Sequence, residues 1–170
     1  MSSRRRRPLT VGMTETERYL TVIAAICAGL CAGVFFAFST FVMPALHKLR
    51  PGAGITAMQE INRAAPNGLF MTALFGPLVV LAWLVVAFAR RSSATTVYIV
   101  AGTICFVAGL LVLMTYHVPH NNALDSVDAT SAGAPDTWRT YYSGWTAWNH
   151  VRTLTFTAAT AFFALALRTD

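Results

Sequence analysis

The chain has 170 residues, of which 55% are hydrophobic and only 12% are charged, and its formal net charge is +6. Soluble domains carry roughly 25% charged residues, so this composition excludes an ordinary water-soluble globular protein. Arg4–Arg7 supply four of the positive charges just ahead of an apolar segment. That position is typical of a topogenic or lipid-headgroup role and argues against nucleic-acid binding.

Four apolar runs, each long enough for an α-helix to cross the hydrocarbon layer, dominate the rest of the chain. They predict an all-α fold, an integral membrane four-helix bundle, in one domain over residues 18–168 behind a basic cytoplasmic tail of residues 1–17. The predicted spans cover about residues 19–42, 69–89, 95–116 and 145–167.

The first connection contains a shorter amphipathic segment. Pro44 lacks an amide hydrogen and is expected to bend or end the first helix. In Gly52–Ala65, the apolar residues Ile55, Met58 and Ile61 recur every three positions. This spacing predicts a short interfacial helix in the first outer connection.

The third span is expected to end at Pro119, ahead of a solvated loop over Asp125–Thr137. The apolar part of the last span, Leu154–Leu167, is only about 21 Å long at 1.5 Å per residue, which is short of the ~30 Å hydrocarbon layer. The helix must therefore extend upstream and carry polar residues, among them Arg152, into or to the edge of the membrane. Such residues indicate a functional site.

Helical spacing sharpens that expectation. Intervals of four, three, four and three residues place five side chains on one stripe: Trp138, Tyr142, Trp145, Asn149 and Arg152. An aromatic belt with a snorkelling arginine is the alternative interpretation, although a belt explains neither the Asn nor its pairing with Arg.

The distribution of Lys and Arg predicts a cell-membrane protein with both termini in the cytoplasm, because eight of these residues then lie inside and five outside. With this orientation, most polar residues able to bind a ligand or move a proton gather on the extracytoplasmic side. Besides the Trp145–Arg152 segment, they are His47, Gln59, Asn62, His117, His120, Asn121 and Asn122.

Four histidines at that end raise the question of a metal. Imidazoles bind copper, zinc or iron. The alternative ligand set is His47, His117, His120 and His150. No carboxylate stands beside a histidine in a helical metal-binding motif, so no metal is the leading expectation and a copper or other His-bound metal is the alternative.

Four short blocks resemble the anthrone oxygenase-like family of small membrane proteins, over about residues 20–167. The most specific is the closing Trp145-x-x-Trp148-Asn149-x-x-Arg152 pattern. The other blocks are Phe38-Ser39 with Val42–Leu46, Met58-Gln59 with Ile61-Asn62, and Val118-Pro119 with Asn121–Leu124. Fungal members of this family oxidise anthrones to anthraquinones.

The resemblance implies a monooxygenation with O₂ as co-substrate and no cofactor, because an anthrone gives an enolate that can itself pass an electron to O₂. Such a reaction needs a general base, donors for the enolate oxygen and an apolar slot. Transferred to this sequence, His150 is the base with His117 as its competitor, and Asn149 and Arg152 are the oxyanion donors. The predicted substrate-binding residues are Trp145 and Trp148 as walls, with Asn62, Asn121 and Gln59.

Two alternatives to a membrane monooxygenase acting on a lipophilic aromatic molecule remain open at this point. The first is a non-enzymatic four-helix membrane protein that binds a small molecule or serves as a complex subunit. The second is a His-coordinated, metal-dependent membrane oxidase. The expected partners are a lipophilic substrate and membrane lipids, with no nucleic acid, and a homo-oligomer is left open.

Overall fold

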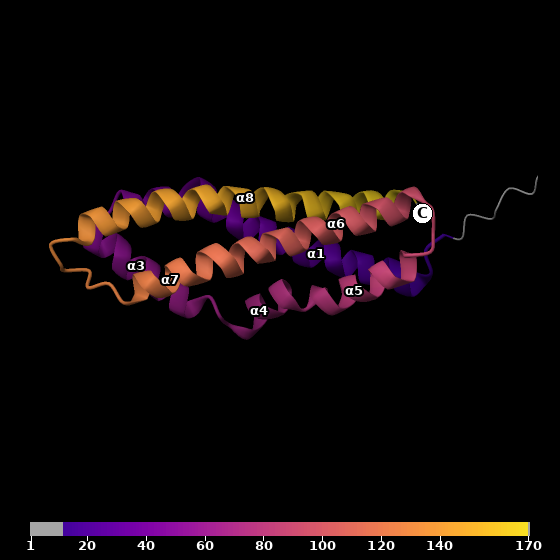
Figure 1. Ribbon diagram of the computed structural model, residues 1–170, viewed down its shortest axis with the longest axis horizontal. Helices are drawn as coiled ribbons and strands as arrows, with labels where there is room; N and C mark the ends of the chain where they lie inside the picture. The colour runs from indigo at the N-terminus through magenta and orange to yellow at the C-terminus, as the bar shows by residue number, and fades with distance from the viewer. Residues whose placement is uncertain (1–11, 170) are drawn as a thin grey trace, which may run out of the picture.

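The computed structural model describes residues 12–169, and the predicted basic segment Arg4–Arg7 lies outside them. In the described part, four helices are long and apolar enough to cross a membrane. They pack side by side into an elongated bundle (Figure 1). Large apolar side chains cover its outer surface, such as Val79 and Val86, which are 78% and 76% exposed. The prediction of an all-α membrane bundle is confirmed.

The first rod runs continuously over Glu15–His47 and consists of three segments. Helix α1 (Glu15–Ala37) passes into a π-helical turn, η1 (Phe38–Val42), and then into α2 (Met43–His47). Pro44 lies in the first turn of α2, so it does not end the rod. The wider π turn immediately before it accommodates the proline ring and the missing amide hydrogen.

The predicted amphipathic segment forms α3 (Pro51–Ala64), which buries Ile55 and Met58. The second rod has two helices, α4 (Gly68–Phe75) and α5 (Pro77–Phe88), which meet at Gly76. A Cβ atom at Gly76 would lie 2.5 Å from the carbonyl oxygen of Thr72, so this junction requires glycine.

The third rod repeats the design of the first. Helix α6 (Ala94–Val112) passes into a second π-helical turn, η2 (Leu113–His117), and then into α7 (Val118–Asp125). The prediction that this helix ends at Pro119 is wrong, because the π turn again precedes the proline and the chain stays helical to Asp125.

The last rod is the single helix α8 (Ala134–Arg168). It begins eleven residues earlier than the predicted span, and the expected loop over 125–137 shrinks accordingly. Helix α8 packs along both α1 and α6, and these are its main contacts in the bundle (Figure 1). Phe156 is fully buried there, with its ring centroid 5.4 Å from that of Phe35 and 5.1 Å from that of Phe106.

Candidate functional site

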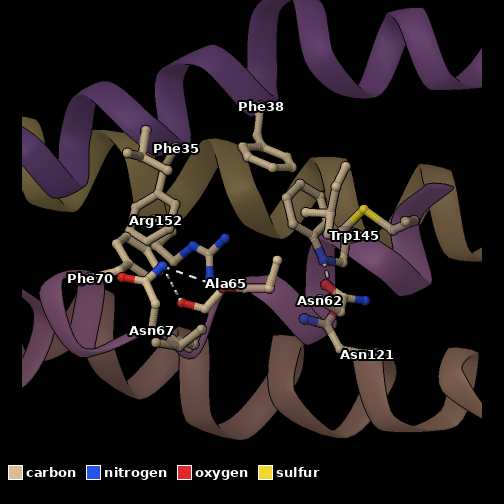
Figure 2. Close-up of a pocket in the computed structure, with 14 residues that line it drawn as sticks. Phe35, Phe38, Asn62, Ala65, Asn67, Phe70, Asn121, Trp145 and Arg152 are labelled. Atoms are coloured by element: carbon tan, nitrogen blue, oxygen red, sulfur yellow. Dashed lines mark hydrogen bonds between the residues drawn. The ribbon is translucent and has the colours of Figure 1, made fainter.

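A cavity of about 410 Å³ lies in the half of the bundle that contains α3. We call it the arginine cavity. Its wall is mainly apolar and aromatic, with a few polar side chains, a composition typical of small-molecule sites. Figure 2 shows it between α1, α3, α8 and the η2 region. The lining residues are Val34, Phe35, Phe38, Met58, Ile61, Asn62, Ala64, Ala65, Asn67, Phe70, Leu113, Asn121, Trp145 and Arg152.

Arg152 supplies the charge of this cavity and is only 3% exposed. Its guanidinium carbon lies 3.8 Å from the centroid of the Phe35 ring and 5.5 Å from that of Trp145. One nitrogen, Nη2, donates to Asn149 Oδ1 at 2.7 Å, whereas the buried Nε has no hydrogen-bond partner within residues 12–169. None of the ion pairs in this part of the chain includes Arg152. A guanidinium has five N–H donors, so this one keeps unused donors at the wall of an apolar space.

Asn149 has a different role from the predicted one. It is fully buried and does not line the cavity. Its Nδ2 donates to the Phe35 carbonyl oxygen at 2.7 Å and to Ser39 Oγ at 2.8 Å. Because Arg152 can only donate, Oδ1 must face the guanidinium, and this fixes the orientation of the amide. Asn149 therefore positions Arg152 and has no amide hydrogen left for a ligand.

Two further asparagines line the cavity opposite Arg152 (Figure 2). Asn121 Oδ1 accepts from the Tyr141 hydroxyl at 2.8 Å and from Trp145 Nε1 at 3.0 Å, which fixes the Trp145 ring. The Nδ2 of Asn62 is buried and has no hydrogen-bond partner among the described residues. A buried donor without a partner costs about 1–3 kcal/mol, and such groups are characteristic of sites that a ligand completes.

The structure does not place His117 in the cavity wall, although it lies close by. The residue is completely buried in η2. Its Nε2 lies 3.3 Å from the Trp145 carbonyl oxygen and its Nδ1 lies 3.4 Å from that of Val112. Its ring packs edge-on against Trp145, with the centroids 5.0 Å apart. His117 thus links η2 to α8 behind the site.

His150 and Trp148 lie on the outer surface of α8. His150 is exposed and does not line the arginine cavity, and Trp148 is 44% exposed and packs on Tyr116. The structure therefore does not bring His150, the predicted base, or Trp148, a predicted wall, into the arginine cavity. At about 100° per residue, His150 is rotated by about 140–160° around the helix axis from Trp145 and Arg152, whereas Trp148 is only about 40° from Arg152 and lies on the flank that packs on Tyr116.

The four imidazoles of the alternative metal site do not converge. His47 stacks on Tyr142 with centroids 4.0 Å apart, and His120 stacks on Tyr116 at 3.9 Å. In residues 12–169, no three His, Cys, Asp or Glu side chains come close enough together to hold a metal ion.

Gln59 also lies outside the cavity wall. Its Nε2 donates to the carbonyl oxygens of Leu124 and Val127 at 2.9 and 3.0 Å, so it satisfies the end of α7 and ties α3 to it. Gln59 was predicted to bind the substrate, whereas in the structure its side-chain nitrogen bonds these two carbonyl oxygens.

Several site residues were missed by the sequence analysis. Phe35 and Phe70 form the aromatic wall beside Arg152, and the Tyr141 hydroxyl holds Asn121. Of the missed residues, only Ser39, in the Phe38-Ser39 block, could have been identified from the sequence. A hydroxyl buried in an apolar span needs a hydrogen-bond partner, and Ser39 has one in Asn149.

The fold and this cavity define a class: an all-α, four-helix membrane protein with a buried arginine in an aromatic pocket. The sequence model of the family described as anthrone oxygenase matches residues 69–162, and the chain belongs to that family. No curated protein and no solved structure matches the chain. The matched region includes Asn121, Trp145 and Arg152, whereas Asn62 lies ahead of it.

Proposed function

We propose that the protein is a membrane-embedded oxygenase that oxidises the acidic methylene of a lipophilic aromatic ketone of the anthrone class with O₂. One observation carries the proposal: Arg152 is a buried guanidinium that faces an aromatic cavity and has no carboxylate partner in the described chain. A fixed cation in an apolar site stabilises developing negative charge far better than the same cation in water.

In this proposal the ring system of the ketone lies among Phe35, Phe70 and Trp145, with its oxygen toward Arg152. Loss of one methylene proton gives an enolate, whose oxygen accepts from Arg152, while the side-chain amides of Asn62 and Asn121 face the opposite edge of the ring system (Figure 2). The enolate passes an electron to O₂, and recombination of the two radicals forms a C–O bond as a hydroperoxide. Loss of water from the hydroperoxide leaves a new carbonyl group. The net change is CH₂ plus O₂ to C=O plus H₂O.

The described wall of the arginine cavity contains no carboxylate and no imidazole that could accept the proton. The hydrogen-bond donors of the cavity must therefore make the methylene of the bound ketone acidic enough to lose it. Stabilising the enolate lowers the pKa of the bound ketone, so that water can accept the proton. O₂ is the co-substrate, and we propose no metal or organic cofactor, because the enolate itself is the reductant.

The same wall also fits a second function, a carrier or binder of lipophilic aromatic anions. The observation that favours it is the absence of a proton acceptor in the described lining. Such a protein would bind product-like phenolates as tightly as the oxygenase but would not consume O₂.

The test measures O₂ consumption and quinone absorbance with 1,8-dihydroxyanthrone, using the full chain in lipid nanodiscs. We expect Arg152→Gln to lower the turnover rate above the uncatalysed oxidation by about 10²–10³-fold, as does loss of a charge-stabilising donor elsewhere. Arg139→Gln is the matched control, because Arg139 lies on the same helix but is exposed and pairs with Asp136. Equal turnover in the two variants would overturn the proposal, and ligand binding without any O₂ consumption would favour the binder.

We also propose that the arginine cavity faces the extracytoplasmic side, with both termini in the cytoplasm. The excess of Lys and Arg at the termini and the α5–α6 turn supports this orientation. An epitope inserted at Gly133, in the loop before α8, should then be accessible from outside intact cells, whereas one appended at the C-terminus should not.

A further inference from the structure

A second cavity, of about 400 Å³, adjoins the arginine cavity. We call it the side cavity. The two cavities have part of their walls in common, and the shared residues are Asn62, Ala65, Phe70, Leu113 and Asn121. Phe70 on α4 and Leu113 in η2 are therefore side chains at the boundary between the two spaces. Beyond them, the side cavity is bounded mainly by apolar residues that do not line the arginine cavity.

The bend between α4 and α5 accounts for this second space. Helix α5 packs on α6, whereas α4 makes its main contacts with α1 and α5. Helix α4 does not pack against α6 or α7 in the way that α5 packs on α6. Because Pro77 opens α5 and Gly76 permits the bend, the chain itself directs α4 outward. The side cavity occupies the space between α4 and the third rod.

Most of the wall of the side cavity belongs to two rods long enough to span a membrane, Gly68–Phe88 and Ala94–Asp125, and the remainder comes from the end of α3 and the segment that follows it. Some of its lining side chains are fully buried, as is Leu74, while others lie on the lipid-facing surface. Met114 is 50% exposed and Phe75 is 38% exposed. An opening between two spanning helices whose edge consists of exposed apolar side chains faces hydrocarbon and not water.

A charged pair closes the end of the side cavity nearest α3. Arg63 Nη2 and Asp125 Oδ1 lie 2.7 Å apart, and both side chains line the cavity. The Asp125 carboxylate raises the pKa of Arg63, so that the pair stays charged. A half-exposed ion pair is most stable at the polar interface, which places the wide apolar part of the side cavity deeper in the membrane.

We propose that the side cavity is a lateral entrance through which a lipophilic ligand passes from the bilayer, between Phe70 and Leu113, to Arg152. The proposal rests on the function proposed above for the arginine cavity. It assigns Met71 and Met114, which line only the side cavity, to the control of access. Flexible methionine side chains adapt readily to a passing ring system.

The test follows binding of 1,8-dihydroxyanthraquinone by stopped-flow absorbance in nanodiscs, because this product-like probe is not turned over. Met71→Trp and Met114→Trp should each lower the association and dissociation rates together by about tenfold while leaving Kd within about twofold, since they obstruct the route and not the bound state. Leu111→Trp is the matched control, on the lipid-facing surface of α6 and outside the cavities. A thermal melt of each variant verifies folding.

Rates in both methionine variants that equal those of Leu111→Trp would overturn the lateral entrance. Arg152→Gln separates this outcome from failure of the proposed function, because loss of the charge contact should weaken Kd through a faster dissociation rate alone. If Arg152→Gln leaves Kd unchanged, the function proposed for the arginine cavity fails, while the methionine variants still decide the route.

Discussion

The two halves of the bundle are built in different ways. In the half that contains the start of α1 and the end of α8, regular helices pack through apolar contacts, and Gly102 and Gly109 admit the rings of Phe163 and Phe156. In the half that contains α3, two rods widen into the π-helical turns η1 and η2, and polar side chains are buried between them.

Both π turns flank the same stretch of α8. Ser39 in η1 accepts from Asn149, and His117 in η2 lies against the Trp145 carbonyl oxygen. A π turn adds a residue to the helix and changes which side chains face the neighbour. The comparison indicates that the regular half supplies stability, whereas the irregular half holds Arg152 and its cavity.

The largest effect on the irregular half is expected from Asn149→Ala, apart from loss of Arg152 itself. Without the amide, the guanidinium loses the acceptor that orients it, so turnover should fall by about 10²-fold. O₂ consumption measures this, and Ser143→Ala, at an exposed position on the same helix, is the control. Partial recovery in Asn149→Gln would support positioning, and unchanged turnover in Asn149→Ala would contradict it.

Gly109→Val tests the regular half. A Cβ atom at this position would lie 2.6 Å from the Phe156 ring, so the packed helices must separate. We expect a destabilisation of about 1–3 kcal/mol, as for other overpacked cores, with little change in the Kd for the anthraquinone probe. Unfolding in detergent measures the first quantity. Gly33→Val, where a Cβ atom meets nothing within 4 Å, should be nearly neutral.

The substitution Glu17→Gln tests the ion pair between Glu17 and Arg91, which belongs to the regular half. Glu17 accepts from both terminal nitrogens of Arg91, at 2.6 and 3.0 Å, and is almost completely buried. Removing its charge should cost about 1–2 kcal/mol of stability and leave ligand affinity unchanged. Glu15→Gln, at an exposed site two residues earlier on the same helix, serves as control. A change in probe affinity would show that the halves are coupled.

The smallest effect is expected from His150→Ala. The imidazole is exposed and outside the arginine cavity, so turnover should stay within about twofold of the original protein. A tenfold loss, with an unchanged melting temperature, would restore His150 as a proton acceptor and would move the reacting centre toward the surface of α8.

The residues of the arginine cavity show how far sequence reasoning reached. Asn62, Asn121, Trp145 and Arg152 were predicted as one site, and the structure brings them around one cavity. His150 and Trp148 belong to the same sequence block but face outward, because a block of neighbours on a helix spans every direction around its axis. Gln59 was predicted to be part of the site because it is polar, but its side-chain nitrogen donates to a carbonyl oxygen near the end of α7.

The helix ends were harder to predict than the helices. Pro44 was expected to bend or end its helix and Pro119 to end its helix, yet each follows a π turn that packs against α8, and both rods stay helical. The aromatic walls Phe35 and Phe70 were hidden because apolar residues in a membrane span carry no signal that separates a cavity wall from a lipid-facing side chain.

The sequence by itself determined that four helices are long and apolar enough to cross the membrane and that polar residues gather at one end. The length of each apolar run, and the polar residues that interrupt it, can be identified directly from the order of the residues. Only the tertiary structure decided which of those polar groups share a cavity and which merely hold the helices together. That choice depends on the rotation of each helix about its axis, which the two π turns change and which packing against α8 fixes.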